Sequence, residues 1–252
     1  MRTIAIVGSA LVLLAQAAAG VNAAELKVAS ALAMSPALKA LAGQFERDSG
    51  HKLVFDFGTA GQVKGRVEAG DSVDLVITAA SAIEDLIKQG KIATGSRVDI
   101  AKVGIGVAVR SGAPKPDISS TESFKSALLA AKSISRGDPG AGGAAGVHVA
   151  RVLERLGIEA EVKAKSKLAT GPAIAELTAK GETEIAITQI SEIVPVPGVD
   201  LVGPLPKELQ NITVFAAGLS ANAKEPEAAR ALIKFLTGPG AVEIRKTGME
   251  PG

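Results

Sequence analysis

The chain of 252 residues carries 28 Lys and Arg against 26 Asp and Glu, and it contains no cysteine, tryptophan or tyrosine. The lack of cysteine excludes disulfides and thiolate ligands, and two histidines far apart in the chain give no metal-site spacing, so we expect neither metal nor cofactor. Scattered charge and only six Phe exclude the basic and aromatic surfaces typical of nucleic-acid binding. The length suffices for one large domain or two lobes.

The first 23 residues have the pattern of a secretory signal peptide. Arg2 precedes an uncharged apolar run over residues 4–19, and residues 21–23 place small side chains where a signal peptidase reads them. The apolar run is too short for an anchoring transmembrane helix, and no cysteine follows it for lipid attachment. We therefore expect cleavage after Ala23, export, and a periplasmic location.

Strands and helices alternate through the first part of the remaining chain. We predict strands over residues 26–30, 52–58 and 73–79, separated and followed by helices that begin at Pro36, Gln62 and Ser81. The first helix is indicated by apolar residues at helical spacing, by Pro36 in its first turn and by Gly50 after its last. A βαβαβα order favours a parallel sheet with helices on both faces.

A second α/β set follows an apolar strand at residues 103–110. The pattern predicts helices over 121–131, 146–157 and 171–181 and strands over 132–137, 161–166, 184–189, 199–206 and 211–220, with two closing helices within 225–248.

These two sets predict an α/β protein with two lobes, each a mainly parallel sheet flanked by helices, and a ligand cleft between them. We assign residues 24–102 and 213–252 to lobe I and residues 103–212 to lobe II. Ligands of such sheets bind outside the carboxyl ends of the strands, so loops from both lobes are expected to line the site.

The most distinctive stretch, residues 135–150 (SRGDPGAGGAAGVHVA), places glycines and alanines between a strand and a helix. Residues 140–145 fit a dinucleotide-binding pattern with Glu159 as its acid, but such a site belongs in the first βα unit of a cytoplasmic enzyme. Glycines at a helix start also leave backbone N–H groups open to an anion. A flexible glycine loop without a ligand is the alternative.

Three other helix starts are built from small residues, before Pro36, around Thr59 to Gly61, and at Thr170. Each Ser or Thr there could be an ordinary N-cap. There are four such helix starts, two in each predicted lobe. We expect them to meet at the cleft and to bind one anion there.

Titratable side chains near these starts are candidates for chemistry. His148 lies in the first turn of the helix after the glycines, where it could pack, bind an anion or transfer a proton near neutral pH. Glu192 is a second candidate for proton transfer, and Arg136 could clamp a carboxylate. The sequence has no nucleophile elbow and no phosphate loop, which argues against the common hydrolase classes.

Several segments resemble the periplasmic molybdate-binding proteins of ABC transporters: residues 26–50, 66–79, 137–139 with 145–157, and 235–248. The similarity runs through nearly the whole exported chain. It implies the type II periplasmic-binding fold, a small anionic ligand, delivery to a membrane permease, and a monomer.

At the positions that the resemblance assigns to the family's binding residues, this sequence carries different side chains. The two serine donors fall on Ala33 and Ala60, and the tyrosine donor falls on Gln189, while the backbone donors fall near Ala145 and Thr170. Lost hydroxyl donors to a charged ligand cost about 1.5–3 kcal/mol each, which makes molybdate itself doubtful. Neighbouring positions complete the candidate site: Ser30, Met34, Thr59, Gly61 and Gly146.

Smaller side chains also imply a larger cleft, able to hold a di- or tricarboxylate. Divergent relatives of these binders include periplasmic aconitate isomerase, which interconverts cis- and trans-aconitate without a cofactor. Two functions therefore remain open: binding of a small anion for an ABC transporter, or aconitate isomerisation with His148, or Glu192 behind it, as the proton-transfer residue.

Overall fold

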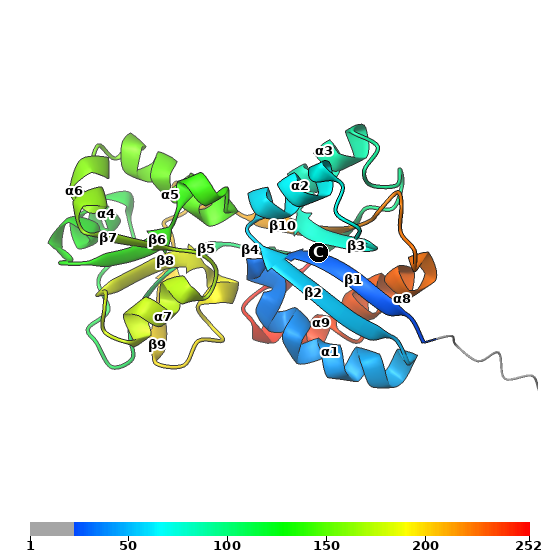
Figure 1. Cartoon of the computed structure of the whole chain (residues 1–252). Coiled ribbons are helices and arrows are strands. Elements are labelled where there is room, and N and C mark those ends of the chain that lie inside the picture. The colour runs from blue at the N-terminus through cyan, green and yellow to red at the C-terminus, as the bar shows by residue number, and fades with distance from the viewer. Residues whose placement is uncertain (1–22) are drawn as a thin grey trace, which may run out of the picture.

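The computed structural model describes residues 23–252, and the predicted signal peptide, apart from Ala23 at its end, lies outside the described residues. Two α/β lobes lie side by side and are connected through the middle of the molecule (Figure 1). The predicted two-lobed α/β class is therefore confirmed.

Lobe I is built on a sheet whose described strands follow the order β11-β4-β10-β3-β1-β2. These strands are β1 (Glu25–Ala31), β2 (Lys52–Gly58), β3 (Leu75–Ala79), β4 (Val98–Val103), β10 (Thr213–Leu219) and β11 (Glu250–Pro251). Its helices are η1 (Leu32–Met34), α1 (Ser35–Ser49), α2 (Ala60–Ala69), α3 (Ala80–Lys88), α8 (Pro226–Thr237) and α9 (Ala241–Lys246). Strand β1 runs parallel to β2 and β3, whereas β10 runs antiparallel to β3 and β4.

Helices cover both faces of this sheet because side chains alternate along its strands. Val28 faces the core shared with α1, α8 and α9, and the adjacent Ala29 faces the core shared with α2 and α3. Burial on both faces explains why the adjacent residues Val28 and Ala29 are both apolar.

Lobe II is built on a second mixed sheet, with described strands in the order β7-β6-β8-β5-β9. These strands are β5 (Ile105–Arg110), β6 (Ile134–Gly137), β7 (Ser166–Ala169), β8 (Ile185–Gln189) and β9 (Val199–Pro204). Its helices are α4 (Thr121–Ala130), η2 (Pro139–Ala141), α5 (Ala144–Arg155), α6 (Glu159–Ala164), α7 (Ala173–Ala179) and η3 (Ile190–Glu192). One core lies under α4, α5 and α6, and a smaller one lies under α7.

Three sequence predictions need correction. Both sheets are mixed rather than mainly parallel, because β10 runs antiparallel to β3 and β4 in lobe I and β5 runs antiparallel to β8 and β9 in lobe II. Residues 161–166 are not a strand: α6 occupies most of this segment, because Ile158 and Val162 are buried at helical spacing. Strand β4 was not predicted, although it lies between β10 and β11. Its sequence, VDIAKV, does not alternate regularly, and the stronger apolar pattern that begins at Val103 hid it.

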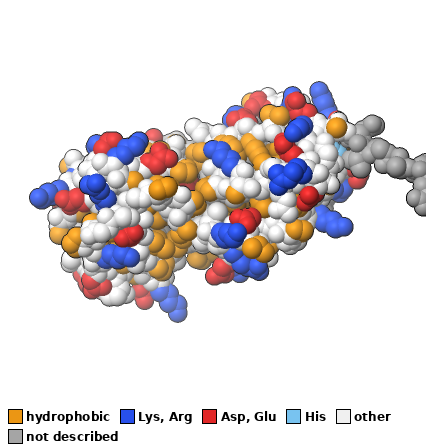
Figure 2. All heavy atoms as spheres, turned by 90° about the horizontal axis from the view of Figure 1, so that it is seen from below, with side chains coloured by type: hydrophobic (Ala, Val, Ile, Leu, Met, Phe, Trp, Pro, Cys, Tyr) orange, Lys and Arg blue, Asp and Glu red, His pale blue; other side chains and the backbone are white. Residues whose placement is uncertain are grey.

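The chain passes between the lobes where β4 leads into β5 at Gly104, and again between β9 and β10. Gln210 ties these crossings together, because its side-chain amide accepts a hydrogen bond from the Ile105 N–H and donates one to the Ile105 carbonyl, both at 2.9 Å. From below, hydrophobic side chains gather along the boundary between the lobes, and charges of both signs are scattered elsewhere (Figure 2).

Candidate functional site

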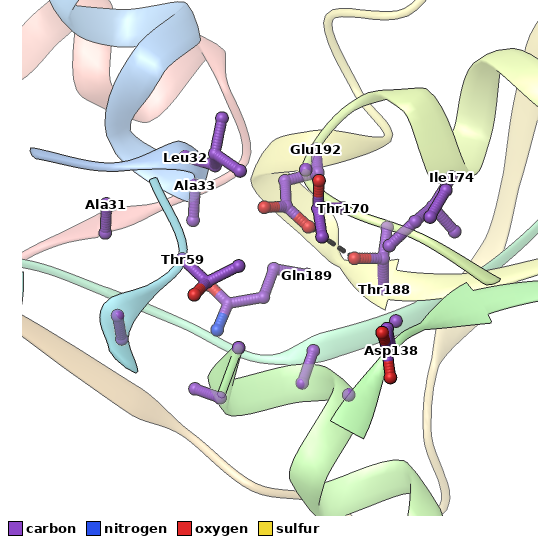
Figure 3. Close-up of a pocket in the computed structure, with 18 of the residues that line it drawn as sticks. Ala31, Leu32, Ala33, Thr59, Asp138, Thr170, Ile174, Thr188, Gln189 and Glu192 are labelled. Atoms are coloured by element: carbon purple, nitrogen blue, oxygen red, sulfur yellow. Dashed lines mark hydrogen bonds between the residues drawn. The ribbon is translucent and has the colours of Figure 1, made fainter. Parts of the chain in front are cut away.

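A cavity of about 50 Å³ lies where the two lobes meet (Figure 3). Lobe I contributes the loop after β1, the start of α2 and a side chain of β10, and lobe II contributes the ends of β6, β7 and β8 with the segments that follow them. The lining residues are Ala31, Leu32, Ala33, Thr59, Ala60, Gly137, Asp138, Gly143, Ala144, Ala145, Gly146, Ala169, Thr170, Gly171, Ile174, Thr188, Gln189, Glu192 and Phe215. The cavity thus lies at the carboxyl ends of strands from both sheets.

One side of the cavity is closed by direct backbone contact between the lobes. The N–H of Gly61, in the first turn of α2, donates to the carbonyl of Gly142 at 3.1 Å, and the Thr59 hydroxyl donates to the carbonyl of Ala141. A Cβ on Gly61 would lie 3.1 Å from the Gly142 Cα. Glycine at this position is what allows the two backbones to meet.

The glycine-rich stretch also brings α5 against the end of β6. A Cβ added to Gly146 would lie 3.0 Å from the Gly137 carbonyl carbon, closer than ordinary packing allows. The first turn of α5, which includes Ala144 and Ala145, therefore starts at the cavity wall. Its N–H groups have no intrahelical acceptors, and the helix dipole adds positive potential there.

Glu192 brings a carboxyl group into this enclosed space. It lies in η3, directly after β8, and is 6% exposed. The Thr188 hydroxyl donates to its Oε2. Burial raises the pKa of Glu192 to about 7, and the hydrogen bonds from the Thr188 hydroxyl and the Gln189 backbone only partly oppose this effect. The group can therefore hold or release a proton near neutral pH.

Gln189 lies beside Glu192 and is 3% exposed. Its Nε2 donates to the Thr213 hydroxyl at 3.1 Å, which joins β8 to β10 across the lobes. Its Oε1 is buried and has no hydrogen-bond partner within residues 23–252. Because unpaired buried polar atoms are costly, this oxygen marks a position where a bound molecule would complete a hydrogen bond.

The charge around the cavity is unusual for an anion site. Among the described residues that line it there is no Lys, Arg or His, and the titratable groups are Glu192 and Asp138. The Asp138 carboxylate accepts the Gly140 N–H at 2.9 Å and caps η2. Positive potential at the cavity therefore comes from backbone N–H groups and the start of α5.

The structure brings eight of the candidate residues to the cavity: Ala33, Thr59, Ala60, Ala145, Gly146, Thr170, Gln189 and Glu192. Ser30 and Met34 are buried in lobe I beside it, and the Gly61 N–H is used in the seam between the lobes.

His148 lies outside the cavity, in an adjoining outer groove of about 350 Å³ that Lys64 and Arg151 also line. Its Nε2 is 2.7 Å from the carbonyl oxygen of Leu209, so this nitrogen carries the proton and donates. The ring lines the outer groove, which Ala144 separates from the cavity because it borders both. Of the two candidates for proton transfer, Glu192 therefore lines the cavity and His148 does not.

Arg136 is directed toward the β7 side of lobe II. Its Nε donates to the Ser166 hydroxyl at 2.9 Å, and the residue is not among those that line the cavity. Burial lowers the pKa of the Arg136 guanidinium, against the opposing effects of Glu159 and Asp138. A carboxylate clamp by this side chain would require it to leave its present partner.

Two lining residues with polar side chains were not among the candidates, Thr188 and Asp138. Thr188 and Glu192 are four residues apart across the end of a strand. This spacing predicts contact between two side chains within a helix but not at the end of a strand. Asp138 follows the strand before the glycines, and that position could have suggested it.

Residues 23–252 contain no group of three or more His, Asp or Glu side chains arranged to hold a metal ion. Among the helices of this same part of the chain, none has the length and apolar character needed to cross a membrane.

Two α/β lobes that enclose a cavity at the carboxyl ends of their strands define the class of type II periplasmic-binding folds. The chain belongs to the bacterial extracellular solute-binding protein family, which it matches over residues 26–250. The resemblance to molybdate-binding proteins is confirmed: ModA of Azotobacter vinelandii is 31% identical over 246 residues, 91% of this chain and 90% of that protein.

Two further comparisons bear on fold and function. An aconitate isomerase of Pseudomonas sp is 32% identical over 233 residues, which cover 90% of this chain and 87% of that protein. The solved Azotobacter vinelandii periplasmic molybdate-binding protein superposes with a TM-score of 0.74 at 23% identity and covers 89% of this chain and 98% of its own. The structural match supports the fold, and the chain is similar to both a binding protein and an enzyme.

Proposed function

We propose that the protein is exported to the periplasm, closes its two lobes over a small anion, and delivers that anion to an ABC transporter permease. The observation that carries this proposal is the enclosed cavity between the lobes, into which the first turn of α5 brings backbone N–H groups. Lobe I is residues 24–102 and 213–252, and lobe II is residues 103–212.

The ligand we favour is a di- or tricarboxylate rather than molybdate. Ala33 and Ala60 offer no hydroxyl donors, and the resemblance to the molybdate binders implies that Gln189 replaces their tyrosine donor. An amide can pair with carboxylate and carboxyl groups, and alanine side chains occupy less of the cleft than serine side chains would.

Isothermal titration calorimetry tests this proposal directly. The purified protein is titrated with molybdate, tungstate, sulfate, cis-aconitate and tricarballylate, the last a saturated tricarboxylate that cannot isomerise. We expect binding of a carboxylate and weak or no binding of molybdate. Binding of molybdate alone would contradict the assignment, and binding of none of these anions would contradict anion capture as a whole.

A second function, aconitate isomerisation, is favoured by one specific feature, the buried Glu192 at the cavity. Moving the double bond of aconitate breaks a C–H bond at the CH₂ carbon, shifts the allylic electron pair, and forms a C–H bond at the former alkene carbon. A single base can take the first proton and return it to the second carbon. A carboxylate whose pKa is raised to about 7 by burial is a stronger base than an exposed one.

Proton NMR of the protein with cis-aconitate separates the two functions. If the protein is an isomerase, signals of trans-aconitate appear, and Glu192→Gln reduces the rate by at least about a hundredfold while His148→Gln keeps most of it. Loss of turnover in His148→Gln with turnover retained in Glu192→Gln would reverse this assignment. Binding without turnover would leave the transport function.

A further inference from the structure

The side of the cavity formed by Gln189 and Glu192 presents hydrogen-bond acceptors, whereas the backbone N–H donors lie at the start of α5. The Oε1 of Gln189 is buried and unpartnered within the described chain. The carboxyl of Glu192 uses Oε2 to accept the Thr188 hydroxyl, and Figure 3 shows its other oxygen turned away from Thr188, toward lobe I. An anion that reaches this side of the cavity adds further acceptors, so a proton is needed between it and the carboxyl of Glu192.

The charges of the residues that line the cavity also favour a protonated Glu192. From lobe I, the side chains that face Glu192 across the cavity belong to residues that do not titrate: Ala31, Leu32, Ala33, Thr59, Ala60 and Phe215. From lobe II, Asp138 is the titratable neighbour, and it would add negative charge. Since no cationic side chain of the described residues lines the cavity, an ionised Glu192 would repel a bound anion at short range.

A protonated Glu192 removes this conflict. Its O–H donates a hydrogen bond, and no second negative charge remains beside the ligand. The burial of the carboxyl keeps the protonated form accessible near neutral pH, because desolvation disfavours the charged form.

We propose that the cavity binds its anion together with one proton, which is held between Glu192 and the ligand, so that Glu192 makes capture of the anion depend on pH. This inference rests on the proposed function, namely that the anion is bound between the lobes. It applies equally to a transported ligand and to a substrate, and it assigns Glu192 a binding role that does not require turnover.

The test is calorimetric titration with tricarballylate at about pH 8, in Hepes and in Tris, two buffers with different heats of ionisation. The dependence of the measured heat on the buffer gives the number of protons taken up on binding. We expect uptake that approaches one proton per ligand, and a Kd that rises about tenfold for each pH unit above about pH 8. With Glu192→Gln we expect no uptake and a Kd that stays flat with pH.

Two matched variants control for other sources of pH dependence. Glu176→Gln makes the same chemical change at an exposed position of α7 outside the cavity lining, and His148→Gln removes the histidine of the outer groove. Both should keep the proton uptake and the slope of the wild type. If Glu192→Gln fails to fold, Thr188→Val provides a second route. It removes a hydrogen bond that favours the ionised carboxyl, so the onset of the pH dependence should move to higher pH.

Tight binding of tricarballylate without proton uptake, or with uptake that persists in Glu192→Gln, would overturn the inference and leave the proposed function intact. Uptake that disappears in His148→Gln would also overturn it, because the proton would then belong to the outer groove. If tricarballylate, sulfate and molybdate all fail to bind between about pH 6 and pH 9, the proposed function itself fails and the inference fails with it.

Discussion

At the scale of single residues, the chemistry of the site depends on side chains that the closed lobes remove from water. Glu192 has one oxygen bonded to Thr188 and the rest of its carboxyl in the cavity, and Gln189 has an unpaired oxygen beside it. In an open, hydrated cleft both groups would be ordinary polar residues. Closure removes both groups from water, and this burial is what raises the pKa of Glu192.

The raised pKa of Glu192 predicts a pH dependence of stability. Below about pH 4.5 the carboxyl is protonated in both the folded and the unfolded chain. Between about 4.5 and 7 the unfolded chain ionises it and the folded chain does not, so the free energy of unfolding falls as pH rises, by about 3 kcal/mol in total. Above about pH 7 both states are ionised and the effect is constant.

Urea unfolding of the wild type and of Glu192→Gln across this range measures the effect. The unfolding free energy of Glu192→Gln minus that of the wild type should rise steadily from about pH 4.5 to pH 7 and then stay constant. Other titrating groups cancel because they are common to both proteins. Parallel curves would show that the carboxyl is solvated in the folded protein.

Sequence reasoning could identify Gln189 and Glu192 as candidates but could not rank Glu192 above His148. The ranking of these two residues depends on which of the two adjoining pockets each one lines. His148 falls on the flank that contacts the Leu209 carbonyl, and a lone helix start does not reveal its partner segment about sixty residues further along the chain.

At the scale of elements, α5 and β6 meet at two glycines, Gly137 and Gly146. A methyl group on either would press on the backbone of the other, so the start of α5 and its N–H groups are positioned by contact with the sheet. The sequence predicted a helix after a glycine-rich loop, and the reason for the glycines lies in this contact and in the seam between Gly61 and Gly142.

Gly146→Ala should therefore displace the start of α5. We expect a loss of about 1–3 kcal/mol in unfolding stability from overpacking, together with weaker anion binding. Gly65→Ala is the matched control, since nothing lies near a Cβ there and α2 is helical; it should gain up to about 1 kcal/mol. Urea unfolding and calorimetric titration measure both effects. Normal stability and affinity in Gly146→Ala would show that α5 is not held by this contact.

Element prediction succeeded where one apolar period was dominant and failed where two patterns competed. The helix of α1 was predictable because Pro36, Leu41 and Gly50 agree on its start, face and end. The segment at α6 also alternates as a strand would, and only the burial of Ile158 and Val162 on one side decides for a helix.

At the scale of the whole molecule, the structure represents a closed arrangement of the lobes. Backbone contact at the seam leaves a cavity of about 50 Å³, which is small for a tricarboxylate. We expect the lobes to separate to admit the ligand, by movement about the segments at Gly104 and Gln210, and to close again over it so that the seam re-forms.

Gly61→Ala tests closure without touching Glu192 or Gln189. The added methyl group would lie 3.1 Å from the Gly142 Cα and should hold the seam open. Small-angle X-ray scattering with saturating tricarballylate should give a larger radius of gyration than the wild type, and the affinity should fall by about tenfold or more. Gly65→Ala on the same helix should match the wild type. Equal compaction of Gly61→Ala and wild type would mean that the seam does not form in solution.

The most direct measurement of the central claim is a crystal structure of the protein grown with tricarballylate. The account predicts the tricarboxylate between the lobes, with carboxylate groups at the first turn of α5, at Gln189 and at Glu192. Electron density for the ligand in the outer groove beside His148 and Arg151, with the inner cavity unchanged, would contradict it.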